Sequence, residues 1–228
     1  MIRAVIFDVD NTLTDFMKMK RAAVDSAVEG MIDAGLRIKK EAMVEKIFDT
    51  YWKEGVEDQK IFDKVLKHEL GAIDYKILAA GIIAYRRAKT GTMALYPRVH
   101  LTLLSLARLG IKSVALSDAP KLEVWLRIVA LGLHNYFDQV VTSEDLGSHK
   151  PAPGPFRKAL EVLGTKPAET LMVGDWAERD VAGAKNLGIR TAWAKYGDTQ
   201  GTEDSGAEFV LGDIYELVGI VRKENGVA

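Results

Sequence analysis

The sequence predicts an α/β fold: a doubly wound parallel sheet with a helical domain inserted after the first strand. The chain opens on a short, β-branched apolar run, residues 2–7, of the kind buried on both faces of a parallel sheet. From about Met17 to Thr90 the periodicity is helical only. After Pro97, strand and helix patterns alternate at the spacing of a doubly wound sheet. These three observations carry the prediction.

The inserted block contains apolar residues at the offsets of helical stripes. Its first stripe consists of Val24, Ala27, Val28, Met31 and Ile32. Gly35, Gly55 and Gly71 lie near the ends of stripes, where a glycine can adopt the left-handed conformation that ends a helix. We therefore expect a helical domain of residues 16–91 and a Rossmann-like sheet domain of residues 1–15 and 92–228.

After the helical block, strands and helices are expected in alternation. The predicted strands are residues 113–116, 139–142, 170–173, 191–194 and 209–211. The predicted helices are residues 99–109, 121–131, 155–163, 178–187 and 214–222. Because each strand is short and largely apolar, we expect helices on both faces of the sheet.

Composition limits the partners and the chemistry. The 228 residues are 48% hydrophobic, and 31 basic against 32 acidic residues leave a net charge of −1. This balance gives no general attraction to nucleic acid or anionic lipid, and no apolar run approaches the roughly 20 residues that cross a bilayer. Met1 leads into the first strand without a secretory signal, so we expect a cytoplasmic protein. Cysteine is absent, which leaves oxygen ligands and four histidines for any metal.

Two carboxylates follow the first strand. Asp8 and Asp10 are two positions apart, so they project to the same side if the backbone stays extended. Open α/β sheets bind ligands at the carboxyl ends of their strands. Taken alone, an Asp-x-Asp at a strand end is more often a polar turn than a site. The functional interpretation therefore depends on which residues follow the other predicted strands at this edge of the sheet.

Three further polar groups follow later strands. Ser117 and Asp118 come directly after the second predicted strand, where a hydroxyl and free backbone N–H groups can hold a phosphoryl oxygen. Lys150 lies in the loop after the third, and its ammonium can neutralise a carboxylate and a phosphate. Asp175 and Asp180 follow the fourth and add acidic oxygen ligands. Four consecutive strand units thus place polar or charged side chains at the same edge of the predicted sheet.

With these motifs the chain resembles the haloacid dehalogenase-like hydrolase superfamily. The motifs are Asp8-x-Asp10-x-Thr12, Ser117, Lys150-Pro151 and Gly174-Asp175-x4-Asp180. The resemblance covers essentially the whole chain, and the phosphoglycolate phosphatase-like branch is the best broad match. It implies a Rossmann-like core, with the helical block as a C1-type cap.

The resemblance also implies an activity. We expect a Mg²⁺-dependent phosphatase that hydrolyses a small phosphorylated metabolite through an aspartyl-phosphate intermediate. Asp8 is expected to be the nucleophile and Asp10 the general acid and base. Mg²⁺ is expected on the side chains of Asp8 and Asp175 and on the carbonyl of Asp10. Asp180 is expected either to orient Lys150 or water, or to bind the ion itself.

The phosphate group is expected to bind at Ser117, Asp118 and Lys150. Many relatives carry Asn where this chain has Asp118, so we expect its backbone N–H to serve while the side chain points away. Thr12 is expected to hold the loop that aims the two aspartates. Trp176 is bulkier than the usual small polar residue, and either narrows the site or packs. We expect a monomer or a small homo-oligomer.

The same residues bear on four alternative functions. A dehalogenase has no use for Asp10 or Asp175, which argues against that activity. A phosphomutase keeps both aspartates of the first motif, so the motifs do not exclude it. A phosphonatase needs an imine-forming lysine in the helical block, for which Lys18, Lys20 and Lys53 are candidates. A non-catalytic binding module of the same fold would usually have lost a catalytic carboxylate, and all are present here.

Overall fold

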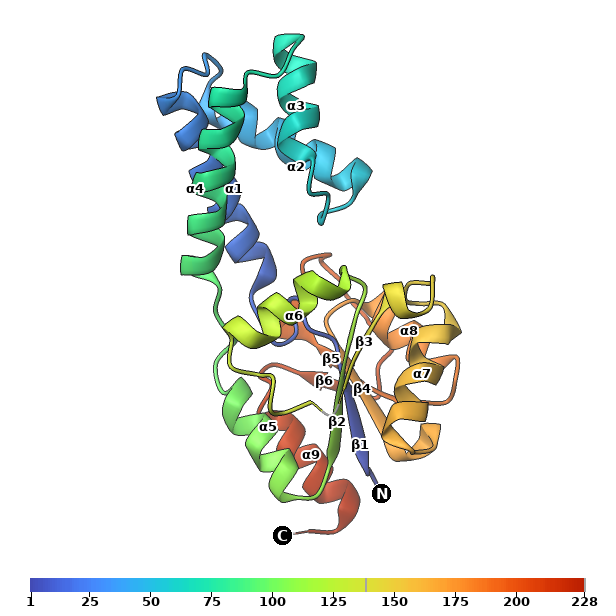
Figure 1. The fold of residues 1–228 in the computed structure, drawn as a ribbon. Coiled ribbons are helices and arrows are strands. Elements are labelled where there is room, and N and C mark those ends of the chain that lie inside the picture. Colours follow the sequence, from blue (N-terminus) through green and yellow to red (C-terminus); the bar gives the residue numbers. More distant parts are fainter. Residues whose placement is uncertain (138, 228) are drawn as a thin grey trace. The chain divides into compact units, whose positions relative to one another are not determined.

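The computed structural model describes residues 1–137 and 139–227. The chain divides into two compact units (Figure 1). The sheet unit consists of Met1–Asp15 and the chain from Ala94 onward, and the helical unit is Phe16–Met93. Within the described residues, none of the helices combines the length and the apolar character needed to span a bilayer.

Among the described residues, six strands form one parallel sheet in the order β3-β2-β1-β4-β5-β6. They are β1 (Ala4–Phe7), β2 (Lys112–Ser117), β3 (Gln139–Thr142), β4 (Thr170–Gly174), β5 (Arg190–Ala194) and β6 (Phe209–Leu211). The chain runs outward from β1 through β2 to β3, then crosses back to β4 on the other side. Ligands of open α/β sheets bind at such a reversal of strand order. The predicted doubly wound parallel sheet is confirmed.

Helices cover both faces of this sheet. They are α5 (Val99–Arg108), α6 (Lys121–Ala130), α7 (Pro153–Leu163), α8 (Ala182–Lys185) and α9 (Glu216–Asn225). In β1, Val5 and Phe7 pack in a core with residues of α5, α6 and α9. Ala4 and Ile6 pack in a second core with residues of α7 and α8. Alternate side chains of a strand point to opposite faces, so β1 is buried from both sides.

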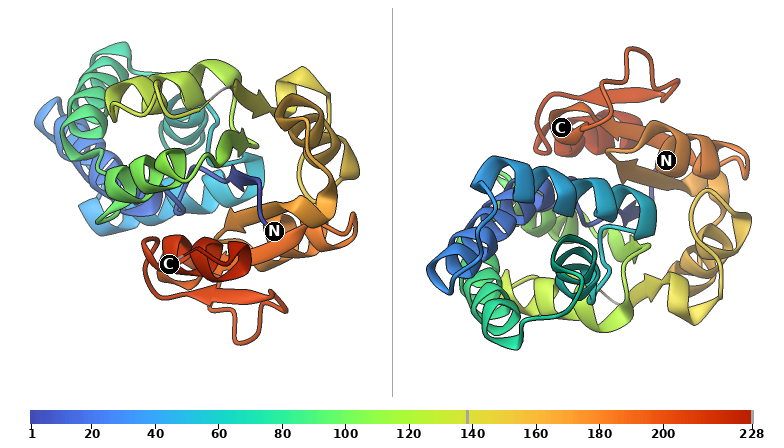
Figure 2. Two further views of the ribbon diagram at one scale, coloured as in Figure 1. Left: turned by 90° about the horizontal axis from the view of Figure 1, so that it is seen from below. Right: turned by 90° about the horizontal axis from the view of Figure 1, so that it is seen from above.

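The end of α9 lies beside the start of β1, as Figures 1 and 2 show. The Asn225 side chain accepts a hydrogen bond from the backbone N–H of Ile2 at 2.6 Å and donates one to the Ile2 carbonyl at 2.8 Å. These bonds satisfy backbone groups that precede the first strand. They anchor the amino end of β1, whose carboxyl end carries Asp8.

The helical unit contains α1 (Phe16–Asp33), α2 (Lys40–Glu54), α3 (Ile61–Leu70) and α4 (Tyr75–Thr92). The predicted stripe of α1 is largely buried in one core with residues of the other three helices. Gly55 and Gly71 directly follow α2 and α3 with φ of 104° and 75°. Glycine adopts such positive φ without a steric penalty, which agrees with the predicted helix ends.

One candidate for an imine-forming lysine is built into the core of the helical unit. Lys20 is 3% exposed, and its Nζ donates to the Tyr85 hydroxyl at 3.0 Å. The same Nζ lies 4.2 Å from the centre of the Tyr51 ring, within cation–π range. Burial of the uncharged Tyr51 hydroxyl raises the pKa of Tyr51. These contacts give Lys20 a packing role within its own unit.

One predicted helix has a different form. In place of one continuous helix over residues 178–187, the chain forms a π-helical turn, Ala177–Val181, followed by the short α8. The Asp180 side chain lies against Gly174 at the end of β4, where an added Cβ would come within 2.3 Å of it. Apolar periodicity cannot separate a π turn from an α turn, and π turns often occur at functional sites.

The loop after β1 is held by a close contact with a later turn. Asn11 has φ of 59°, and its N–H donates to the Thr14 carbonyl at 2.8 Å. The Asn11 carbonyl packs against Gly197, where an added Cβ would lie 1.7 Å from the oxygen. Only glycine therefore fits at position 197 with this loop in place.

Gly197→Ala is expected to lower the free energy of unfolding by about 2 kcal/mol or more, because its methyl group forces the two backbone segments apart. Gly212→Ala is the matched control, since its added methyl group would lie 3.6 Å from the Glu216 carboxylate, an ordinary contact. Urea denaturation of both variants measures the difference. Wild-type stability in Gly197→Ala would show that the loop is not held in this way.

Candidate active site

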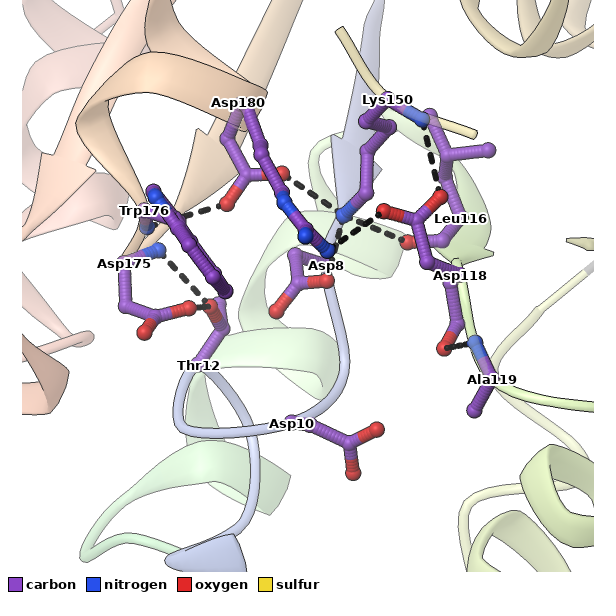
Figure 3. Close-up of polar contacts among 12 residues, drawn as sticks. Asp8, Asp10, Thr12, Leu116, Asp118, Ala119, Lys150, Asp175, Trp176 and Asp180 are labelled. Carbon is purple, nitrogen blue, oxygen red and sulfur yellow. Dashed lines mark hydrogen bonds and ion pairs between the residues drawn. The ribbon is translucent and has the colours of Figure 1, made fainter. Parts of the chain in front are cut away.

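A buried lysine joins the carboxyl ends of the central strands (Figure 3). Lys150 Nζ donates to Asp8 Oδ1 and to Asp180 Oδ1, each at 2.6 Å, and lies 3.4 Å from the Leu116 carbonyl oxygen. Lys150 is 5% exposed, so these bonds form away from bulk water. The ammonium therefore links the first motif, at the end of β1, to the turn that follows β4.

Asp8, Asp175 and Asp180 form a cluster, here called the acidic triad. All three are buried, and one carboxylate oxygen of each lies within 4.8 Å of the other two. Lys150 supplies a single positive charge for these three groups. Like charges this close cannot all stay ionised in a buried site without a further cation or bound protons.

Burial and neighbouring charges shift the pKa values of Asp175, Asp180 and Lys150. Burial first, and the neighbouring Asp8 carboxylate second, raise the pKa of Asp175 above its ordinary value. Burial also raises the pKa of Asp180, and the opposing effect of the Lys150 ammonium does not cancel this rise. Burial alone would lower the pKa of Lys150, but the Asp180 and Asp8 carboxylates outweigh it and hold that pKa above its ordinary value. The lysine stays charged.

Asp175 is held by two residues from other segments, Thr12 and Trp193, and Tyr196 holds Thr12 in turn. The Thr12 hydroxyl accepts the backbone N–H of Asp175 at 3.1 Å and donates to Asp175 Oδ1 at 3.3 Å. Trp193 Nε1 donates to the Asp175 carbonyl at 2.7 Å, and the Tyr196 hydroxyl donates to the Thr12 carbonyl at 2.7 Å. The sequence motifs indicated Thr12 but not Trp193 or Tyr196, which have no motif of their own.

Asp118 is engaged by the loop that carries Lys150. Its Oδ1 accepts the backbone N–H of Lys150 at 2.9 Å, and its Oδ2 lies 3.4 Å from an Arg179 guanidinium nitrogen. The same guanidinium lies 4.0 Å from the centre of the Trp176 ring. The Ser117 hydroxyl accepts the Ala119 N–H at 3.2 Å. The Asp118 side chain thus organises the loop, and Trp176 packs against Arg179.

The Asp10 carboxylate is not part of the acidic triad. In Figure 3 it points away from Asp8 and Asp175. Its Oδ2 accepts a hydrogen bond from a guanidinium nitrogen of Arg127 at 2.9 Å. Sequence reasoning did not find Arg127, although Val124 and Ile128 mark that face of α6 as buried. A charged residue on an apolar stripe was the available signal.

The donor set of the triad fits a hard divalent cation. It offers carboxylate oxygens only, which Mg²⁺ prefers over nitrogen or sulfur. Within residues 1–137 and 139–227, Asp8 Oδ2 is buried and has no hydrogen-bond partner, whereas Asp8 Oδ1 is held by Lys150. An unpaired buried carboxylate oxygen is costly, so it indicates a place for a cation or an electrophile. Asp8 and Asp175 would hold the cation, because both oxygens of Asp180 are engaged, Oδ1 by Lys150 and Oδ2 by the backbone N–H of Trp176.

Comparison with known proteins agrees with the motifs. The family model for haloacid dehalogenase-like hydrolases matches residues 2–188. A glyceraldehyde 3-phosphate phosphatase from Methanocaldococcus jannaschii is 35% identical over 225 residues, which cover 97% of this chain and 98% of that protein. A phosphoglycolate phosphatase from Aquifex aeolicus is 31% identical over 202 residues, which cover 86% of each chain.

Solved structures show the same fold. The crystal structure of a HAD phosphatase from Thermococcus onnurineus superposes with a TM-score of 0.72 at 25% sequence identity, over 96% of this chain and 98% of that chain. The motifs, the sheet order and the relatives all lead to one assignment. The chain belongs to the haloacid dehalogenase-like hydrolase family and groups with its phosphatases.

Proposed function

We propose that this phosphoric monoester hydrolase works through an aspartyl-phosphate on Asp8 and depends on Mg²⁺. The observation that carries the proposal is the state of the Asp8 carboxylate. Oδ1 is fixed by Lys150, while Oδ2 is buried without a partner in the described structure, within the acidic triad. A carboxylate that Lys150 holds in a fixed orientation can bind a cation with one oxygen and attack phosphorus with the other.

The reaction then proceeds in two steps that balance in protons. In the first, an Asp8 oxygen bonds to phosphorus, the bond from phosphorus to the leaving oxygen breaks, and Asp10 gives that oxygen its proton. In the second, water attacks the phosphorus of the aspartyl-phosphate, Asp10 takes a proton from the water, and the bond to Asp8 breaks. Phosphate leaves, and both carboxyl groups return to their starting states.

Lys150 and the cation site offset the negative charge that gathers during the reaction. Lys150 already contacts Asp8 and can neutralise a phosphoryl group bound beside it. Mg²⁺ bound by Asp8 and Asp175, and by the Asp10 carbonyl as the family resemblance implies, would supply the additional positive charge that the triad requires. Asp180 would keep the ammonium of Lys150 in position, which its 2.6 Å contact supports.

The relatives support a small phosphorylated metabolite as the substrate. The Methanocaldococcus jannaschii protein, matched over nearly its whole length, is named a glyceraldehyde 3-phosphate phosphatase. The Aquifex aeolicus protein, a phosphoglycolate phosphatase, is matched over a smaller share. We therefore take a three-carbon aldehyde phosphate as the leading candidate substrate and 2-phosphoglycolate as the competitor.

Asp8→Asn is expected to abolish turnover, with kcat reduced by about 10⁴-fold or more, because an amide cannot displace the leaving group from phosphorus. Phosphate release from an aryl phosphate measures this, and circular dichroism checks the fold. Asp33→Asn, an exposed carboxyl group in α1, is the matched control and should keep wild-type activity. Wild-type turnover in purified Asp8→Asn would refute the assignment of the nucleophile.

EDTA is expected to remove activity, and added Mg²⁺ to restore it. Asp175→Asn should raise the Mg²⁺ concentration needed for half-maximal activity by about tenfold or more, whereas the exposed Asp204→Asn should not change it. Because the pKa of Asp175 is raised, protons compete with the cation in the wild-type protein. The Mg²⁺ concentration that the wild-type protein needs for half-maximal activity should therefore fall from about pH 6 to about pH 8. Full activity in EDTA would exclude the metal-dependent mechanism.

Glyceraldehyde 3-phosphate is expected to give a kcat/KM at least about tenfold above that of 2-phosphoglycolate, a preference worth about 1.4 kcal/mol in the transition state. Phosphate release is measured against enzyme-free blanks, because the aldehyde eliminates phosphate slowly by itself. Asp8→Asn serves as the enzyme control for contaminating phosphatase. A preference for 2-phosphoglycolate would transfer the substrate assignment to that acid and leave the mechanism unchanged.

A further inference from the structure

Arg127 is a charged residue on the buried face of α6, where the neighbouring residues are apolar. It lies in the last turn of α6, next to Ile128 and one turn after Val124, both of which are fully buried in the core. Arg127 itself is 1% exposed. Its guanidinium nitrogen donates to Asp10 Oδ2 at 2.9 Å, and the Asp10 side chain is 21% exposed.

Stability does not account for this pair. Removing two charges from water costs several kcal/mol per ion, and a buried ion pair is often no better than apolar residues of similar volume. A leucine at position 127 would continue the stripe of Val124 and Ile128 without that cost. A buried arginine aimed at one of the two carboxylates of the first motif therefore indicates a functional constraint.

The position of Asp10 relative to the acidic triad explains the constraint. Asp10 is two residues from Asp8, and a cation bound by Asp8 and Asp175 would attract every carboxylate within reach. A carboxylate bound to that cation could not exchange protons with substrate or water. Arg127 offers the Asp10 carboxylate a competing positive partner, and in Figure 3 that carboxylate points away from Asp8 and Asp175.

We propose that Arg127 is a positioning residue that holds the Asp10 carboxylate outside the acidic triad. This inference rests on the proposed function, since it assigns Asp10 the proton transfers and the triad the cation. With Arg127 in place, the Asp10 backbone stays near the cation site, while its carboxylate faces the space where leaving group and water react. Without Arg127, the carboxylate moves into the triad.

Arg127→Met tests the proposal, because it keeps most of the side-chain volume and removes the guanidinium. We expect kcat for an alkyl phosphate to fall by about 100-fold with KM changed by less than about threefold, since proton transfer contributes in that range. Arg108→Met, an exposed arginine of α5, is the matched control and should keep wild-type kinetics. Arg127→Lys retains the charge and should recover part of the lost rate.

A double-mutant cycle with Asp10→Asn separates positioning from a general structural defect. If Arg127 acts through Asp10, Arg127→Met lowers kcat by about 100-fold in the wild-type background and by less than about threefold in the Asp10→Asn background. The same fold loss in both backgrounds would overturn the proposal. So would wild-type kcat in a folded Arg127→Met protein. If that variant does not fold, the cycle is run with Arg127→Lys.

Metal binding without substrate gives a readout independent of activity. Mn²⁺ titration by calorimetry should show tighter binding in Arg127→Met than in wild type, and part of this gain should disappear when Asp10 is Asn, because an added carboxylate ligand caused it. A purely structural role predicts weaker binding or an identical gain in both backgrounds. If wild-type protein shows no phosphatase activity, the proposed function fails, and the Mn²⁺ cycle still reports where the Asp10 carboxylate lies.

Discussion

The excess of negative charge in the acidic triad is the constraint on which the rest of the structure depends. The three carboxyl groups are buried, and one carboxylate oxygen each of Asp8, Asp175 and Asp180 lies within 4.8 Å of the other two. Lys150 contributes one positive charge to this cluster. If all three carboxylates are ionised, their negative charge exceeds the positive charge of Lys150 by two. Protons, a divalent cation or both must offset them. Burial, and then the neighbouring Asp8 carboxylate, raise the pKa of Asp175, and Asp8 Oδ2 has no hydrogen-bond partner among the described residues.

The fold is what forces these charges together. Asp8 and Asp175 follow β1 and β4, which are neighbours at the point where the strand order reverses. Thr12 ties the two loops by two hydrogen bonds, and Gly197 lets the loop of β1 pack closely against the turn after β5. These contacts within the sheet unit therefore hold the carboxylates close together.

Much of this arrangement could be predicted from the sequence, because its determinants are local. Alternating strand and helix patterns gave the parallel sheet, and the motifs placed Asp8, Lys150, Asp175 and Asp180 at one edge. The structure brings these four side chains together. The roles assigned to them remain predictions that the experiments test.

The parts that the sequence did not predict depend on contacts between distant segments. Trp193 and Tyr196 support the site through their polar atoms, yet each occupies an ordinary place after or within a strand. Arg127 contacts a residue more than a hundred positions away, and the turn at Asp180 is π-helical although its pattern fits an α-helix. Periodicity reports which face is buried, but it does not identify a polar partner from another element.

The most direct test of the central claim is the location of a metal ion in crystals of this protein grown with Mn²⁺ as a stand-in for Mg²⁺. Anomalous scattering identifies the ion independently of the protein atoms. The account predicts one strong peak bound by carboxylate oxygens of Asp8 and Asp175, with Lys150 still contacting Asp8 and the Asp10 carboxylate on Arg127. A peak elsewhere, or an acidic triad without any ion at saturating Mn²⁺, would contradict it.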